Sequence, residues 1–195
     1  MNEVMRQEKK YAINLADGSY LRARLGGVMI QDAHNGASGY AIRSLYFDTL
    51  DDQDFKEKID GLELRRKVRL RIYSPDADSA KLEIKQKQGP YQKKRSLQIT
   101  REDALLLCQG NYSPLLRYRD PFAAECYGLM TCRCYRPKAI VEYRRQAYIA
   151  KENQIRLTLD SQIAATESCY DLFPPRLPLS PVLEPYHMVL EVKYN

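Results

Sequence analysis

Basic side chains recur at every second position along two stretches of this sequence. RRKVRLRIY carries Lys67, Arg69 and Arg71 in alternation with apolar residues. KLEIKQK carries Glu83 and Lys85 two positions apart, again with apolar residues between the charged ones. This spacing places the charges on one face of a β-strand. Several Arg and Lys side chains on one face can grip an anion with many phosphate oxygens, and a carboxylate among them can hold a divalent cation that bridges such oxygens. These residue types therefore favour a highly charged anionic ligand, such as one that carries phosphate groups.

The same alternation of charged and apolar residues recurs elsewhere in the chain. An antiparallel sheet with one solvated face would also show it, and for any single strand that is the simpler explanation. Two features favour an internal surface instead. The charged positions are mostly Lys and Arg with a single Glu or Asp per strand, and the predicted helices are placed to cover the apolar faces. If the sheet closes into a barrel, a lining rich in Arg and Lys would repel itself unless an anion filled it.

Eight stretches have the residue types and the period of β-strands, with turn residues between them. They cover residues 6–15, 40–49, 62–74, 80–89, 91–99, 137–150, 153–165 and 187–195. The helical patterns are inserted between groups of strands and do not follow each strand. This order predicts an α+β fold with a largely antiparallel sheet, not a doubly wound parallel sheet.

Helix signals lie at several places between these strands. The predicted helix starts are Asp17, Thr100, Ser113-Pro114 and Asp120-Pro121, and residues 50–61 have helical spacing. Asp and Thr are good N-caps, and Pro is favoured at the first helical position. The first helix should end at Gly26-Gly27. The proline-rich segment 172–185 should be an extended loop.

The composition fits one domain. A chain of 195 residues with 44% hydrophobic and 29% charged residues can bury a core. No run approaches the roughly 20 apolar residues that span a bilayer, and no apolar signal-peptide run opens the chain, so we expect a cytoplasmic protein without a transmembrane segment. The five cysteines include no C-x-x-C pair, which argues against a disulfide framework and a structural zinc site. The formal net charge of +6 favours an anionic partner.

Seven motifs, in order over nearly the whole chain, resemble the successive strands of a polyphosphate polymerase domain, the vacuolar transporter chaperone (VTC) domain. They are RQEKKY at 6–11, RSLYFDT at 43–49, RRKVRLRIY at 65–73, LEIKQK at 82–87, VEYRRQAY at 141–148, IRLTLD at 155–160 and VLEVKY at 189–194. That domain belongs to the triphosphate tunnel metalloenzymes, the superfamily that also includes the CYTH-type phosphatases. Seven motifs in the order of the family identify the family far more specifically than any single motif.

The resemblance implies a closed antiparallel β-barrel of about eight strands, a triphosphate tunnel with helices packed outside. It implies a single domain over residues 1–195, without the C-terminal helical segment that usually follows the last strand in the family. Carried over motif by motif, the implied phosphate ligands are Lys10, Arg69, Arg71, Lys85, Lys94, Arg144, Arg156 and, from the tunnel wall, Lys193. The implied catalytic residues among them are Lys10, Arg69, Arg71, Lys85 and Arg156. Glu191 is the leading ligand for Mn²⁺ or Mg²⁺, and Glu8, Glu83 and Glu142 are further metal candidates.

The implied reaction is metal-dependent transfer of the terminal phosphate of a nucleoside triphosphate, ATP in the first place, onto polyphosphate. Hydrolysis of tripolyphosphate or of a nucleoside triphosphate is the nearest alternative. CYTH-type members begin with E-x-E-x-K, and the basic Arg6 at the first acidic position favours the polymerase branch. Another class is a non-catalytic module that binds polyphosphate or an inositol phosphate. Nucleic acid is a less favoured partner, because Tyr46, Tyr73 and Tyr143 lie at strand positions that indicate packing.

Overall fold

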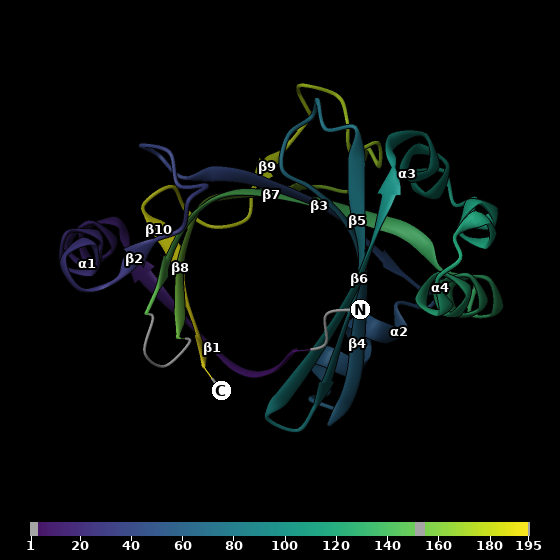
Figure 1. Ribbon diagram of the computed structural model, residues 1–195, viewed down its shortest axis with the longest axis horizontal. Coiled ribbons are helices and arrows are strands. Elements are labelled where there is room, and N and C mark those ends of the chain that lie inside the picture. Colours follow the sequence, from purple (N-terminus) through teal and green to yellow (C-terminus); the bar gives the residue numbers. More distant parts are fainter. Residues whose placement is uncertain (1–3, 151–154, 195) are drawn as a thin grey trace.

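The computed structural model describes residues 4–150 and 155–194, and its elements are labelled in Figure 1. The strands are β1 (Val4–Asn14), β2 (Ile30–Gln31), β3 (Tyr40–Asp48), β4 (Leu64–Ile72), β5 (Ser79–Gln88), β6 (Tyr91–Thr100), β7 (Arg136–Ile149), β8 (Arg156–Thr166), β9 (Ser180–Pro181) and β10 (His187–Tyr194). The helices are α1 (Leu15–Val28), α2 (Gln53–Ile59), α3 (Arg101–Cys108), the 3₁₀-helix η1 (Ser113–Arg117) and α4 (Pro121–Cys132). The predicted α+β class is confirmed. The two short strands β2 and β9 were not predicted.

All ten strands belong to one sheet in which neighbours run antiparallel. Their order is β2-β7-β3-β4-β5-β6-β1-β10-β8-β9, and β7 pairs with β8 in addition. The strands curve around one central axis, and the α-helices lie outside them (Figure 1). The curvature gives each long strand an inner and an outer face, which the alternation of charged and apolar residues requires.

The larger hydrophobic core lies between the outer faces of β3 to β6 and the helices from the middle of the chain. Leu70 of β4 and Leu82 of β5 are fully buried there, together with Leu107 of α3 and Met130 of α4. Burying one such side chain stabilises a fold by about 1.5–3 kcal/mol. Because the outer faces are committed to this core, the charged residues between them must point inward.

The predicted starts of the middle helices are confirmed. The hydroxyl of Thr100 accepts the backbone N–H of Asp103 at 3.2 Å, and the carboxylate of Asp120 accepts that of Phe122 at 2.8 Å. The start at Ser113-Pro114 opens only the short 3₁₀-helix η1. Helices α3 and α4 therefore begin directly after a residue whose side chain accepts one of the free backbone N–H groups of the first turn.

Helix α1 begins at Leu15, earlier than the predicted start at Asp17. The reason is that Asn14 is the N-cap: its Oδ1 accepts the backbone N–H of Asp17 at 2.8 Å. The helix also continues past the predicted stop to Val28. Among the described residues, no helix has the length and apolar content that crossing a membrane requires.

A smaller core lies beneath α1. Tyr148, Leu159 and Met188 are buried there, from β7, β8 and β10. Gly18 of α1 faces Met188 so closely that a Cβ at this position would lie 2.0 Å from the Met188 sulfur. A side chain at position 18 would therefore require the buried Met188 side chain or α1 to move.

Arg43 of β3 anchors the proline-rich segment to the outside of the sheet. Its guanidinium is buried and donates to the backbone carbonyls of Leu172 at 2.8 Å and Pro174 at 2.6 Å, and to the carboxylate of Glu142 at 2.5 Å. Phe173 packs into the larger core. The segment has no regular structure, as predicted, apart from the short strand β9, which pairs with β8.

Candidate functional site

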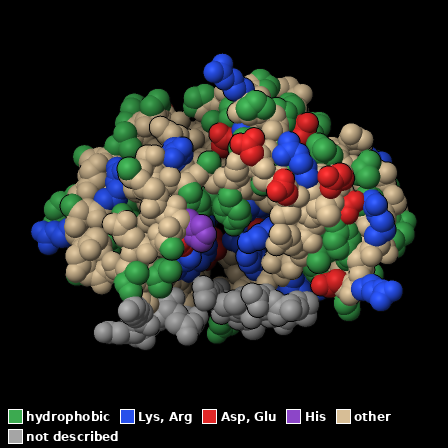
Figure 2. All heavy atoms as spheres, turned by 45° about the horizontal axis from the view of Figure 1, so that its top comes forward, with side chains coloured by type: hydrophobic (Ala, Val, Ile, Leu, Met, Phe, Trp, Pro, Cys, Tyr) green, Lys and Arg blue, Asp and Glu red, His purple; other side chains and the backbone are tan. Residues whose placement is uncertain are grey.

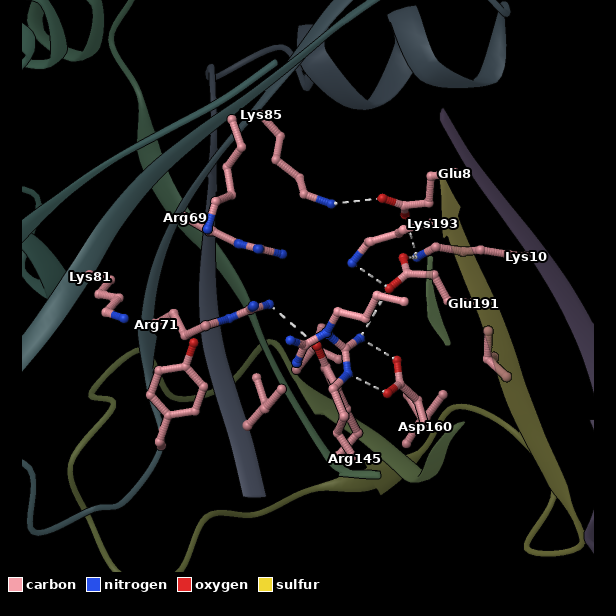
Figure 3. A pocket seen from close by; sticks show the side chains of 18 of the residues that line it. Glu8, Lys10, Arg69, Arg71, Lys81, Lys85, Arg145, Asp160, Glu191 and Lys193 are labelled. Carbon is pink, nitrogen blue, oxygen red and sulfur yellow. Dashed lines mark hydrogen bonds and ion pairs between the residues drawn. The ribbon is translucent and has the colours of Figure 1, made fainter. Parts of the chain in front are cut away.

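The strands surround a cavity of about 630 Å³, and all eight long strands contribute to its lining. The described lining has nine basic residues and three acidic ones: Lys10, Arg69, Arg71, Lys81, Lys85, Lys94, Arg145, Arg156 and Lys193, with Glu8, Asp160 and Glu191. Figure 3 shows most of these side chains converging on a common space. In Figure 2, Lys and Arg side chains are visible inside a hollow of the surface. An excess of positive charge in such a space attracts anions.

Nine of the twelve predicted site residues line this cavity. They are Glu8, Lys10, Arg69, Arg71, Lys85, Lys94, Arg156, Glu191 and Lys193. Glu83 lies directly behind the lining, in contact with two of its cations. Glu142 and Arg144 lie elsewhere.

Glu83 is the buried counter-charge of the arginines on β4. Arg69 and Glu83 are direct neighbours across β4 and β5, and Arg69 Nε donates to Glu83 Oε2 at 2.7 Å. Lys94 Nζ donates to the other oxygen at 3.0 Å. Burial opposes the charge of Glu83, but Arg69, Arg71 and Lys94 lower its pKa to about 2. With both oxygens engaged by cations, Glu83 holds Arg69 in place.

Two tyrosines support the same arginines from the lining. Arg69 Nη1 donates to the hydroxyl of Tyr46, and Arg71 Nη2 donates to that of Tyr143, each at 3.3 Å. Burial raises the pKa of Tyr46, but the charges of Arg69 and Arg71 outweigh burial and lower it to about 8. Tyr46 and Tyr143 were predicted to lie at packing positions, and the structure adds that their hydroxyls orient cations in the cavity.

On the opposite wall, Glu8 of β1 and Glu191 of β10 contact three lysines: Lys10 and Lys193 from the same two strands, and Lys85, which reaches across from β5. Lys10 Nζ lies 3.5 Å from an oxygen of Glu8 and 3.3 Å from one of Glu191. Lys85 Nζ lies 3.3 Å from Glu8, and Lys193 Nζ lies 2.7 Å from Glu191 (Figure 3). Burial lowers the pKa of Lys193 to about 8, although Glu191 acts in the opposite direction. Burial also disfavours the charge of Glu191, yet a hydrogen bond with Glu8 and the nearby cations hold its pKa below the usual range.

Arg145 and Asp160 belong to the site although neither was among the predicted site residues. Arg145 Nε and Nη2 donate to the two oxygens of Asp160, each at 2.6 Å, and Nη2 also lies 3.4 Å from Glu191. Burial disfavours the charge of Arg145, but its hydrogen bonds to Asp160 outweigh burial and raise its pKa. Asp160 lies four residues after Arg156 on the same strand, so the period of two already placed both side chains on one face.

The prediction for β7 placed the wrong set of alternate residues on the face toward the cavity. Arg144 donates to the backbone carbonyl and hydroxyl of Ser38 and to the carbonyl of Gly39, outside the cavity. Glu142 pairs with Arg43 on the outer face. The parity was assigned from the apolar character of Val141, but Val141 lines the cavity, and Ile140 on the other parity enters the main core.

Arg156 is found at one end of the cavity. Its Nη2 donates to the hydroxyl of Tyr40 at 3.2 Å and lies 2.8 Å from Oδ2 of Asp32. Tyr73 and Lys81 line the cavity as well. This end therefore combines two cations with two aromatic rings.

The carboxylates of Glu8 and Glu191 are the residues that could hold a divalent cation. The described part of the chain has no group of three or more His, Cys, Asp or Glu side chains suited to a metal ion. Mg²⁺, however, is often bound by one or two protein carboxylates, with waters and substrate phosphates as the other ligands. Glu8 and Glu191 both face the ammonium of Lys10, so they already share one cation. The side chain of Arg6 lies outside the described part of the chain.

Comparisons with solved structures place the fold among known ones. A candidate adenylate cyclase from Bacillus halodurans has a TM-score of 0.60 at 14% identity, with 99% of this chain and 82% of that chain covered. A candidate adenylyl cyclase from Hippeastrum, described with a dominant triphosphatase activity, has a TM-score of 0.55 at 12% identity, covering 98% and 79%. The Mediator head module of Schizosaccharomyces pombe has a TM-score of 0.50 at 8% identity, covering 98% and 83%. At these identities the likeness shows the fold alone.

The family comparison covers almost the whole sequence. No curated protein sequence matches the chain. The sequence profile of the VTC domain, in contrast, matches residues 5–195. The chain therefore belongs to the VTC domain family, as its seven strand motifs predicted.

Proposed function

We propose that the cavity binds a triphosphate chain and that the protein transfers the terminal phosphate of a nucleoside triphosphate, ATP in the first place, onto polyphosphate. One observation carries the proposal: nine Lys and Arg side chains converge on a cavity with only three carboxylates in its described lining. We further propose that the eight long strands act as a closed tunnel and that residues 1–195 work as one domain. The pairing of β7 with both β3 and β8 supports the tunnel.

The proposed transfer asks the protein mainly for positioning and charge neutralisation. An oxygen at the end of the polyphosphate bonds to the γ-phosphorus, and the bond from that phosphorus to the β–γ bridging oxygen breaks, so that the nucleoside diphosphate leaves. Arg69, Arg71 and Lys85 neutralise the charge that develops on the phosphate oxygens. The described lining holds no Cys or His, which is consistent with direct transfer between phosphates.

In this proposal Glu8 and Glu191 hold Mn²⁺ or Mg²⁺. When bound, such an ion would polarise and neutralise phosphate oxygens. Lys10, which the two carboxylates now share, would be released from them to contact phosphate. Arg145 keeps Glu191 oriented, and Asp160 in turn fixes Arg145.

Hydrolysis is the second candidate function. It is favoured by the shared fold with the Hippeastrum protein described with triphosphatase activity. Water would then replace polyphosphate as the acceptor, with the same cations in the same roles. A module that only binds polyphosphate or an inositol phosphate would use the lining without turnover.

Incubation with ATP and Mn²⁺, followed by gel separation of the products, tests these functions. The comparison includes Glu191→Gln, Arg69→Ala and, as a matched control, Glu102→Gln on the exposed surface of α3. Long polyphosphate from the wild type and the control, and from neither site variant, supports the polymerase. Free phosphate as the sole product supports the hydrolase. Absence of turnover in the wild type contradicts both enzymatic functions.

A further inference from the structure

At one end of the cavity the wall is aromatic and apolar, in contrast to the charged lining elsewhere. Tyr40, Ile42 and Tyr73 line it from β3 and the end of β4, and Val141 and Tyr143 continue the wall on β7. Ile42 and Tyr143 are direct neighbours in the β3–β7 ladder. The hydroxyls of Tyr40 and Tyr143 hold cations, but the ring faces and the side chains of Ile42 and Val141 offer an inorganic phosphate chain neither charge nor hydrogen bonds.

The rings of Tyr40 and Tyr73 lie at an angle to each other; Tyr73 is exposed and Tyr40 is partly buried. Their centroids are 6.2 Å apart with an interplanar angle of 52°, and Tyr73 is 45% exposed. Arg156 fixes Tyr40 through its hydroxyl. Lys81 Nζ lies 5.4 Å from the centroid of the Tyr73 ring. An exposed ring beside cations is a surface on which a flat heterocycle can stack.

The cations continue from this wall into the cavity in an ordered row. Lys81 is the direct neighbour of Arg71 across β4 and β5, and Arg69 is two residues further inward. Figure 3 shows Lys81 beside Arg71, on the side away from Glu8 and Glu191. A nucleoside at Tyr73 would therefore place its phosphates along Lys81, Arg71 and Arg69, with the terminal phosphate toward the glutamates.

We propose that the ring of Tyr73, with Tyr40 beside it at an angle, is the platform on which the base of a nucleoside triphosphate stacks, with Lys81 as the first phosphate contact. This inference rests on the proposed function, and it identifies the end of the cavity that binds the nucleoside. Every base has a π-face, so a stacking platform tolerates different bases. We therefore expect ATP and GTP to bind alike.

Calorimetric titrations of ATP and of tripolyphosphate, in the presence of a chelator so that no turnover occurs, test this inference. Loss of one base–aromatic stack weakens binding roughly five- to hundredfold. Tyr73→Ala should therefore weaken ATP binding by such a factor and leave tripolyphosphate binding unchanged, while Tyr73→Phe should keep both. The matched control is Tyr91→Ala, which removes a ring of similar exposure, 47%, that does not line the cavity, and it should change neither affinity.

The outcomes separate this inference from the proposed function. If Tyr73→Ala weakens both ligands equally, or neither, the platform is refuted while phosphate binding stands. If the wild type does not bind tripolyphosphate, the proposed function itself fails, and the platform fails with it.

Discussion

Replacing Glu83 with Gln tests the charge balance of the cavity wall. Glu83 is 1% exposed and is the common acceptor for Arg69 and Lys94. Gln has nearly the same shape but no charge, so Arg69, itself 7% exposed, would remain buried without its counter-charge. A buried charge that loses its partner costs more than the pair contributed in the first place.

Two estimates of the loss agree. The pKa of Glu83 is about 2 against an ordinary value of 4.5, and this difference corresponds to about 3 kcal/mol at roughly 1.4 kcal/mol per pKa unit. Removing one partner of a buried ion pair typically costs about 3–5 kcal/mol. For a chain of this size, about 3 kcal/mol lowers the melting temperature by roughly 6–12 °C.

The effect has a defined dependence on pH. The pKa of Glu83 is lower in the folded state than in the unfolded state, so its stabilisation is complete above the ordinary value of 4.5 and is lost as the pH falls toward 2. The difference in unfolding free energy between the wild type and Glu83→Gln should therefore be full at neutral pH and shrink below about pH 4.

Thermal denaturation with and without tripolyphosphate is the assay. An anion in the cavity would supply the negative charge that Glu83→Gln removes, so tripolyphosphate should raise the melting temperature of the variant more than that of the wild type. Glu125→Gln is the matched control, because Glu125 also pairs with an arginine, Arg95, but is 46% exposed on the outer side. It should lose less than about 1 kcal/mol and show no added response to the ligand. A Glu83→Gln protein as stable as the wild type, or one that tripolyphosphate does not rescue, refutes the reasoning.

Three further perturbations test other parts of the structure. Arg43→Ala removes the donors to two backbone carbonyls and to Glu142, and urea denaturation should show a loss of about 3 kcal/mol; a loss near zero would mean that Arg43 does not anchor the proline-rich segment. Affinity for tripolyphosphate should fall as the pH rises through about 8, because Lys193 loses its positive charge and Tyr46 gains a negative one there; titrations should show a flatter profile for Lys193→Arg combined with Tyr46→Phe, and an unchanged profile would contradict this assignment. Thr100→Ala removes the N-cap of α3 and should lower the melting temperature by an amount equivalent to about 1 kcal/mol while phosphate binding persists.

The alternation of charged and apolar residues predicted the inner and outer faces wherever helices cover the sheet. On β4, Leu70 belongs to the core, and Arg69 and Arg71 line the cavity, as the period of two requires. Local capping likewise predicted the starts of α3 and α4. These features depend on residues close together in the chain, so the sequence pattern is sufficient to find them.

The parity of β7 could not be predicted because it depends on a distant segment. The outer face at Glu142 is covered by the proline-rich segment, which Arg43 binds through carbonyls about 130 residues further along the chain. Alternation alone does not show which face that segment covers. Arg144 and Arg145 are consecutive and therefore point to opposite faces of β7. Each face thus has an arginine that could bind phosphate, and the sequence does not show which face lines the cavity.

The partners of the lining residues also needed three-dimensional information. The family resemblance implied Glu83 as a metal candidate, and only its contacts with Arg69 and Lys94 show that cations engage both of its oxygens. Tyr46 resembled a packing residue, and only the position of its hydroxyl shows a role in orienting Arg69. Residue type and parity place a side chain in the cavity but do not name its hydrogen-bond partner.

Calorimetric titration of tripolyphosphate into the wild type, Arg71→Ala and Arg133→Ala tests the central claim that the converging cations bind a phosphate chain. Arg71 is buried in the lining, whereas Arg133 is exposed beyond the end of α4. Loss of charge-assisted hydrogen bonds should weaken binding roughly ten- to hundredfold in Arg71→Ala, while Arg133→Ala should bind like the wild type. Equal affinities of all three proteins, or no binding by the wild type, would contradict the account.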